Sequence, residues 1–115
     1  MRLRRASIAA LGAFTLLLAV PSSASAAVGE FQYTYIGLDG QPHIRILLDP
    51  ESRECVTLPE VADPNASLPA HSPRNRTTST ATVFTEPECE GDFFSLRPIV
   101  GRGSERLKLR SVVFS

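Results

Sequence analysis

The sequence contains only two histidines and two cysteines, and it has no tryptophan. His43 and His71 are therefore the only candidates for a histidine general base, and the serines near His71 match no nucleophile motif. A glycine-rich phosphate loop, a metal-binding helix motif and a dinucleotide fingerprint are also missing. These absences predict a protein that is not an enzyme, with both histidines at its surface.

The longest apolar run is too short to cross a bilayer. It extends over 13 residues, from Ile8 to Val20, whereas a transmembrane helix needs about 20. A basic segment precedes it and the small residues Ala24-Ser25-Ala26 follow it, which is the pattern of a secretory signal peptide. We expect residues 1–26 to be a signal peptide and residues 27–115 to form one secreted domain that begins at Ala27 or Val28.

Neither sign of charge dominates, since 12 basic residues balance 12 acidic ones. Removal of residues 1–26 takes away three arginines and no acid, which leaves 9 basic and 12 acidic residues. A mildly acidic domain has no general electrostatic reason to bind nucleic acid or an anionic membrane. All the basic residues except Lys108 are arginine, which favours a bacterial source with a GC-rich genome.

The two cysteines, Cys55 and Cys89, both lie in the expected secreted domain. In an oxidising compartment two cysteines most simply form one disulfide. Their spacing does not fit a Cys-x-x-Cys redox or metal pair, and no third ligand lies nearby in the sequence. We therefore expect a Cys55–Cys89 disulfide that stabilises this small domain by roughly 3–4 kcal/mol.

Strand patterns occupy most of the secreted part. Residues 31–37 alternate aromatic and polar side chains, and Asp39-Gly40 is a strong hairpin signal. The return strand, 43–48, carries Ile44, Ile46 and Leu48 on one side, and Pro42 suggests that it starts at a sheet edge. Further strands are expected at 54–58, 77–84, 92–97 and 106–114, the last with Leu107, Leu109 and Val113 inward and Lys108 and Arg110 outward.

No helical period extends over three turns in this part of the chain. The pattern predicts an all-β fold, a small antiparallel β-sandwich or Greek-key barrel of six to eight strands with one disulfide. Between the strands, residues 59–76 contain Pro59, Pro64, Pro69 and Pro73 and show almost no apolar periodicity. We expect an irregular, partly extended surface loop there, which is either functional or disordered.

A sequence repeat marks the second half of the chain. Val83-Phe84 returns 30 residues later as Val113-Phe114, which suggests paired Greek-key units. Residues 83–96, with their aromatic–acid–Cys–x–Gly core, and residues 109–114 resemble the opening and closing strands of bacterial βγ-crystallin proteins. The resemblance covers residues 77–114. It favours a secreted interaction protein over an enzyme.

Members of that family often bind calcium through an Asn/Asp pair followed by Ser/Thr-Ser. Here Asn75, Thr78 and Ser79 match, but Arg74 stands where an oxygen ligand belongs. Calcium takes six to eight oxygen ligands, and the two arginines beside Asn75 oppose it. These three residues are therefore weak candidates, and we expect neither a metal nor a cofactor.

Four carboxylates gather within residues 86–92. They fit either a cation site or a solvated turn paired across strands with basic residues, and we favour the turn. The expected paired residues are Arg97, Arg102, Arg106, Lys108 and Arg110.

Taken together, the sequence predicts a small, secreted, monomeric interaction module with an extracellular protein as its partner and residues 59–76 as its contact surface. A protease inhibitor and a calcium-stabilised envelope or extracellular structural protein are the alternatives.

Overall fold

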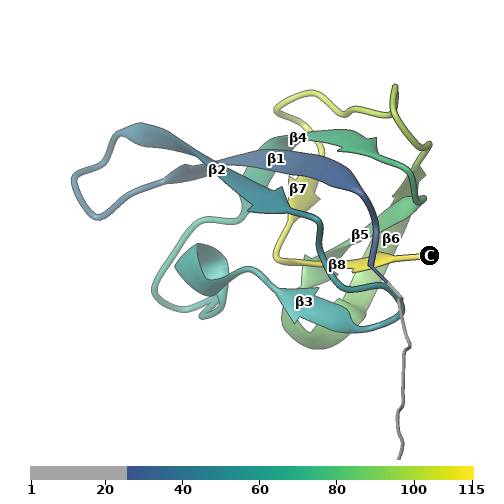
Figure 1. Ribbon diagram of the computed structural model, residues 1–115. Coiled ribbons are helices and arrows are strands. Elements are labelled where there is room, and N and C mark those ends of the chain that lie inside the picture. The colour runs from purple at the N-terminus through teal and green to yellow at the C-terminus, as the bar shows by residue number, and fades with distance from the viewer. Residues whose placement is uncertain (1–25) are drawn as a thin grey trace, which may run out of the picture.

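The computed structural model describes residues 26–115, which form two antiparallel four-stranded sheets around one core (Figure 1). The predicted all-β sandwich with one disulfide is thereby confirmed. The predicted signal peptide lies outside the described residues except for Ala26. Within the described part of the chain, no helix has the length and apolar character needed to cross a membrane.

The first sheet has the strand order β2-β1-β4-β7. β1 pairs with β2 in a hairpin and with β4 on its other side, so β2 forms one edge of the sheet. The strands are β1 (Gly29–Ile36), β2 (Pro42–Leu48), β4 (Ala70–Thr77) and β7 (Lys108–Leu109).

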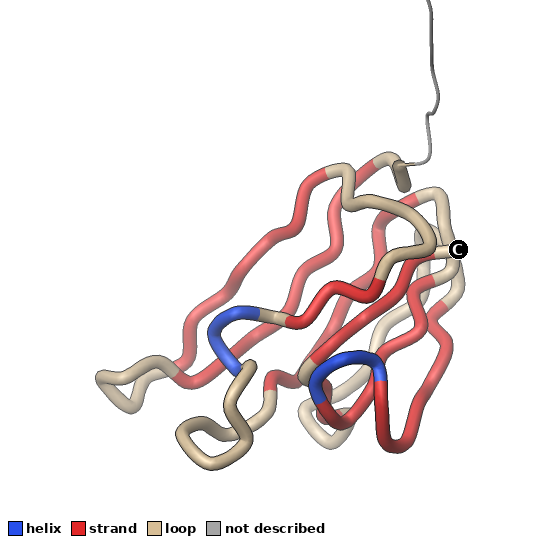
Figure 2. Tube along the Cα trace, turned by 90° about the horizontal axis from the view of Figure 1, so that it is seen from below, coloured by secondary structure: helices blue, strands red, loops and turns tan. Residues whose placement is uncertain are grey.

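The second sheet has the order β3-β8-β5-β6. Its strands are β3 (Cys55–Thr57), β5 (Ala81–Glu86), β6 (Glu90–Leu96) and β8 (Ser111–Phe114). Two short 3-10 turns, η3 (Pro59–Val61) and η4 (Pro87–Cys89), lie on the side of the molecule that Figure 2 shows.

Aromatic side chains join the two sheets. Phe31 and Tyr33 alternate along β1 and are fully buried, as their spacing predicts. The ring of Phe31 meets that of Phe114 edge-on, with centroids 5.3 Å apart, so β1 of one sheet contacts β8 of the other. The other buried apolar residues are Ala27, Leu58, Val61, Ala70, Ala81, Val83, Leu96, Leu109 and Val112.

The disulfide connects β3 to the turn between β5 and β6. The Cα atoms of Cys55 and Cys89 are 5.9 Å apart, and the predicted bond is confirmed. Hydrogen bonds support the same turn, because the Cys89 N–H donates to Ser111 Oγ and the Ser111 hydroxyl donates to the Glu86 carbonyl. The turn is thus attached to β3 through the disulfide and to β8 through Ser111.

The prediction of an irregular loop at residues 59–76 is wrong over its second half, because residues 70–77 form β4 inside the first sheet. Its composition, with Pro73 and two arginines, is atypical of an interior strand. The β1–β4 register shifts beside Pro73, between Gln32 and Thr34, which accommodates a residue without an N–H. The expected strand 77–84 is also divided, since Thr77 ends β4 and Ala81 begins β5.

The expected strand 106–114 is wrong in a similar way. It passes from one sheet to the other at Arg110, which separates β7 from β8. The change of sheet shifts the alternation by one residue, so Val112 and Phe114 are buried and Val113 is on the opposite face. Arg110, expected to point outward, is buried with only 7% of its surface exposed.

Candidate functional site

The hairpin of β1 and β2 extends beyond the body of the sandwich (Figure 1). Gly40 has a φ of 76°, which a glycine adopts without strain, and the Gly37 N–H donates to the Gln41 carbonyl at 2.8 Å. Behind the turn, the His43 ring lies 3.0 Å from the Asp39 carboxylate and stacks on Tyr35. Hydrogen bonds from the Gln41 backbone and then from His43 lower the pKa of Asp39. These contacts give the tip a defined shape.

An open groove of about 820 Å³ separates this hairpin from the chain that follows β3. Both walls mix apolar and acidic side chains. The hairpin wall consists of Tyr35, Ile36, Gly37, Leu38, Asp39 and His43, and the opposite wall of Pro59, Glu60, Ala62, Asp63, Ala66, Ser67 and Leu68.

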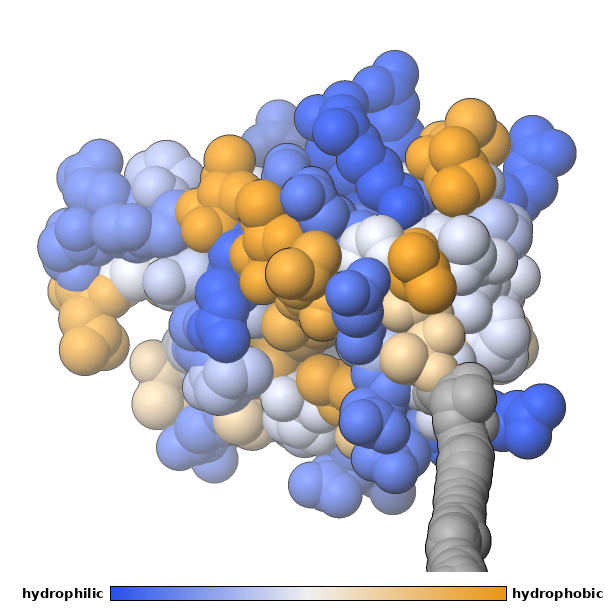
Figure 3. All heavy atoms as spheres, in the orientation of Figure 1, coloured by the Kyte–Doolittle hydropathy of each residue, from blue (hydrophilic) through white to orange (hydrophobic). Residues whose placement is uncertain are grey.

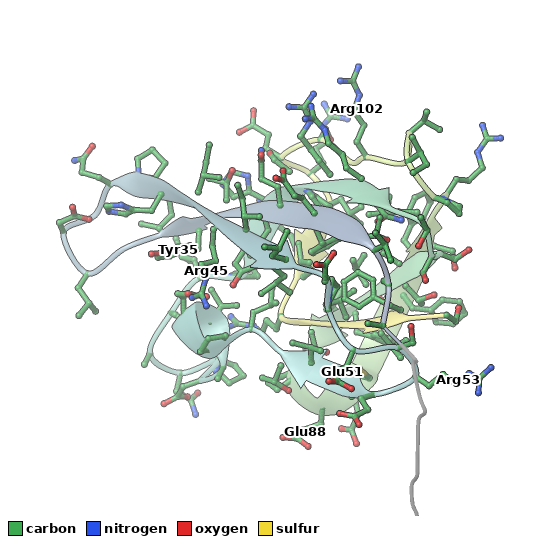
Figure 4. All side chains as sticks on the ribbon, viewed as in Figure 1. Tyr35, Arg45, Glu51, Arg53, Glu88 and Arg102 are labelled. Atoms are coloured by element: carbon green, nitrogen blue, oxygen red, sulfur yellow. A yellow bond between two sulfur atoms is a disulfide. The ribbon has the colours of Figure 1, made fainter. Side chains whose placement is uncertain are left out.

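Glu60 of η3 connects the two walls. Its carboxylate accepts a hydrogen bond from the buried Tyr33 hydroxyl at 2.6 Å and pairs with Arg45 of β2. Burial, followed by the hydrogen bond and charge of Glu60, raises the pKa of Tyr33, so this phenol remains a hydrogen-bond donor. Figure 4 shows Arg45 and Tyr35 at this side of the hairpin.

Arg110 forms hydrogen bonds with the chain segment that makes up the far wall of the groove. One guanidinium nitrogen donates to the Val61 carbonyl at 2.9 Å, and the other donates to the Ser67 carbonyl at 2.8 Å. A buried guanidinium that has hydrogen-bond acceptors at both ends of a short loop fixes that loop in place. The wall is therefore an ordered part of the sandwich.

The outer edge of β2 presents unpaired backbone groups. The Gly37 N–H donates to Gln41 and the Asp49 N–H donates to the Gly29 carbonyl. Because hydrogen-bonded and non-hydrogen-bonded pairs alternate in an antiparallel ladder, the odd-numbered residues of β2 bond to β1. The N–H and C=O groups of the even-numbered residues Ile44, Ile46 and Leu48 therefore face the open edge, where Pro42 presents only its C=O.

The same three residues form an apolar stripe. They lie on one side of β2, as predicted, but that side faces solvent, with exposed fractions of 64% for Ile44, 44% for Ile46 and 68% for Leu48. Figure 3 shows apolar side chains gathered along β2. Edge strands usually carry protecting charges, yet the one Lys or Arg of β2, Arg45, lies on the side opposite the stripe, where it pairs with Glu60. The stripe and the free backbone groups together make this edge a candidate binding surface.

The other edge strands of the described residues differ from β2. β3 and β7 have three and two residues, which is too short to offer much pairing surface. β6 has seven residues but includes the charged Glu90 and Asp92. β2 is thus the long edge strand whose stripe side carries no charge.

The weak calcium candidates have other roles. Asn75 is fully buried, and its amide nitrogen donates to the carbonyls of Ser79, Leu96 and Arg97, while its oxygen accepts from Thr77. Thr78 Oγ1 accepts from the Val28 N–H. Asn75 therefore joins β4 to the end of β6 through its own side chain. Nor do residues 26–115 contain a group of three or more His, Cys, Asp or Glu side chains able to hold a metal ion.

The expected pairing of the acidic turn with basic residues is wrong. Glu86 lies opposite Glu90 in the β5–β6 hairpin, and the only ion pairs of the described residues are His43–Asp39 and Arg45–Glu60. The reason is the strand pairing, because the β5–β6 hairpin places acidic residues of the turn opposite one another instead of opposite basic residues.

The two histidines are not brought together. His43 lies at the hairpin tip, whereas His71 is half-buried in β4, with its Nδ1 2.9 Å from Ser72 Oγ. Of the expected contact surface 59–76, only residues 59–68 line the groove. Sequence reasoning missed Tyr33, Glu60 and Arg110 as groove supports, and it had no signal for Arg110, because a strand that changes sheets breaks the alternation.

Comparisons with family models, with curated proteins and with solved structures find no match to this chain.

Proposed function

We propose that this protein is a non-enzymatic, exported interaction module that binds an extended segment of a partner protein at the open edge of β2. The observation that carries the proposal is the coincidence of outward backbone groups and exposed apolar side chains at Ile44, Ile46 and Leu48. In β-strand addition, such backbone groups provide affinity and alternate side chains provide selectivity. Export through residues 1–26 accords with the disulfide, since such bonds persist in oxidising compartments.

A partner segment fits this edge better than a second copy does. A two-fold axis normal to the sheet would pair β2 with β2 but would leave both apolar stripes on the same exposed face. The contact would then consist of one strand pair, which is small compared with the roughly 1,200–2,000 Å² of a stable interface. A different protein that adds a strand and covers the stripe buries the apolar surface as well.

Contacts around the neighbouring groove hold this edge in place, although the three stripe residues do not line the groove. Glu60 forms an ion pair with Arg45 of β2, and the hydrogen bonds of Arg110 fix the opposite wall of the groove. An edge that is already ordered loses little conformational entropy when a partner binds. The stacked pair of Tyr35 and His43 supports the tip in the same way.

Selection from a displayed random-peptide library tests the proposal. Peptides enriched on the wild-type protein should alternate apolar and polar residues, because only one side of an added strand meets the stripe. Ile46→Lys should weaken their binding by about ten-fold or more, since it places a charge in the contact. Gln32→Lys is the matched control, because Gln32 lies beside Ile46 on β1 but away from the edge; it should change the Kd by less than about three-fold.

A second variant separates backbone pairing from apolar contact. Ile46→Pro removes an N–H that faces the open edge, and proline is tolerated at edge positions. Its circular dichroism spectrum should remain that of the wild type while peptide binding is lost. Equal binding by wild type, Ile46→Lys and Ile46→Pro would disprove the proposal, as would sedimentation data showing a wild-type dimer that Ile46→Lys dissociates.

A further inference from the structure

Three arginines gather on the solvent face of the first sheet, away from the β2 edge. Arg74 and Arg76 are two residues apart on β4 and therefore share a face. Arg102 lies directly opposite Arg74, in an antiparallel bridge between β4 and the 97–107 connection. The three side chains line a hollow of about 350 Å³ with Ile99, Val100 and Gly101. Figure 4 shows Arg102 at this face, among other nitrogen-tipped side chains.

None of these guanidinium groups has a carboxylate partner in the described part of the chain. The two ion pairs there involve other residues, and no side-chain hydrogen bond engages Arg74, Arg76 or Arg102. Glu30 is the cross-strand neighbour of Arg76 but makes no ion pair with it, and the uncharged Gln32 neighbours Arg74. Arg97 adds a further positive charge, since it lines the adjoining hollow with Arg102.

This arrangement is unfavourable in the free protein, because like charges directly opposite one another in a sheet repel. The backbone nevertheless holds it in place. The Asn75 N–H donates to the Gly101 carbonyl at 2.8 Å, and the Gly103 N–H donates to the Pro73 carbonyl at 2.9 Å. A Cβ at Gly101 would lie only 2.4 Å from the backbone nitrogen of Arg97, so glycine is needed where the connection turns toward β4. The arginines are thus attached to a framework that keeps them together.

We propose that this hollow binds a phosphate or sulfate oxyanion, either as a free ion or as a group carried on a polymer. The planar guanidinium presents paired N–H donors that match the oxygens of such groups. An anion bound between Arg74 and Arg102 would replace the repulsion between the two guanidinium groups with two favourable ionic contacts. Ile99 and Val100 are exposed beside the arginines and provide an apolar rim for the organic part of an ester.

The site is separate from the proposed edge of β2. Gln32 and Glu30 of β1 lie between the arginines of β4 and the stripe on β2. Loss of peptide binding at Ile46 therefore says nothing about the arginine hollow, and each site can be tested alone.

Thermal unfolding and titration calorimetry with inorganic phosphate and sulfate, at constant ionic strength, test the inference. The wild-type protein should bind with one-site saturation and a Tm that rises with the anion concentration. Arg74→Gln and Arg102→Gln should each weaken binding by about ten-fold or more. Arg53→Gln is the control, since Arg53 lies at a different side of the molecule (Figure 4) and should bind as the wild type does.

The same variants give an independent readout without any anion. Because Arg74→Gln removes a like-charge pair, its Tm in chloride should be a few degrees higher than that of the wild type. Sulfate stabilises proteins in general by exclusion from their surface, so a Tm increase that is equal in wild type and Arg74→Gln would overturn the proposal.

Polyphosphate and dextran sulfate distinguish a polymer-borne group from a free ion. Binding of either polymer that is lost in Arg102→Gln but retained in Arg53→Gln supports the site with a polymer source. Polymer binding that all variants share, combined with no binding of the small anions, would refute it.

Discussion

Replacing both cysteines with serine, Cys55→Ser and Cys89→Ser, is expected to lower the free energy of unfolding by about 3–4 kcal/mol. The bond closes a loop with a sequence separation of 34 residues, and its removal returns that loop's entropy to the unfolded chain. For a domain of this size the Tm should fall by roughly 15–30 °C. Urea denaturation and calorimetry of the purified domain measure both quantities.

Most of the expected loss of stability comes from the higher conformational entropy of the unfolded chain, and only a small part comes from lost contacts in the folded turn. The backbone N–H of residue 89 can still donate to Ser111 Oγ after the substitution, so the folded double variant should keep its β-sheet circular dichroism spectrum at low temperature. Wild-type protein treated with a reducing agent should match the double variant. A double variant that melts within about 3 °C of the wild type would contradict the assigned role of the bond.

Arg110→Met is expected to cost about 3 kcal/mol of stability and to release the far wall of the groove. The substitution leaves the carbonyls of Val61 and Ser67 without their charged donor. Each buried or half-buried carbonyl that loses its partner costs about 1–3 kcal/mol. Urea denaturation measures the loss, and hydrogen exchange should show faster exchange across residues 61–68 than in the wild type.

Arg110→Lys and Lys108→Met complete this comparison. The lysine variant keeps the charge but cannot reach both carbonyls with a planar fork, so its stability should lie between those of wild type and Arg110→Met. Lys108 is exposed and donates to the Glu105 carbonyl at the surface; its loss should change stability by less than about 0.5 kcal/mol. If Arg110→Met were as stable as Lys108→Met, the structural role of Arg110 would be refuted.

Local patterns were sufficient where a strand remains in one sheet with one buried face. The alternation of Phe31, Tyr33 and Tyr35 predicts β1 and its inward side, and Asp39-Gly40 predicts the hairpin turn. The disulfide follows from cysteine count, since two cysteines allow a single pairing. The stripe of Ile44, Ile46 and Leu48 was also apparent, although its exposure was not, because alternation identifies a side of a strand without saying what covers it.

Prediction failed where neighbouring chain segments determine the structure. Residues 70–77 have little strand propensity, yet β1 pairs along one side of them while β7 and the connection near Gly101 pair along the other. Backbone hydrogen bonds on both sides outweigh a weak local preference. Pro42 indicated that the start of β2 lies at a sheet edge, but only the strand order shows that the whole strand has a free side.

The sequence by itself thus determined the all-β class, the hairpin and the covalent crosslink, because each depends on residues close in the chain or on the number of cysteines. The tertiary structure decided the strand 70–77, the burial of Arg110 and the meeting of Arg74 with Arg102. Those features arise from pairing between segments far apart in sequence, and the energy of such pairing belongs to the assembled sheets rather than to any one segment.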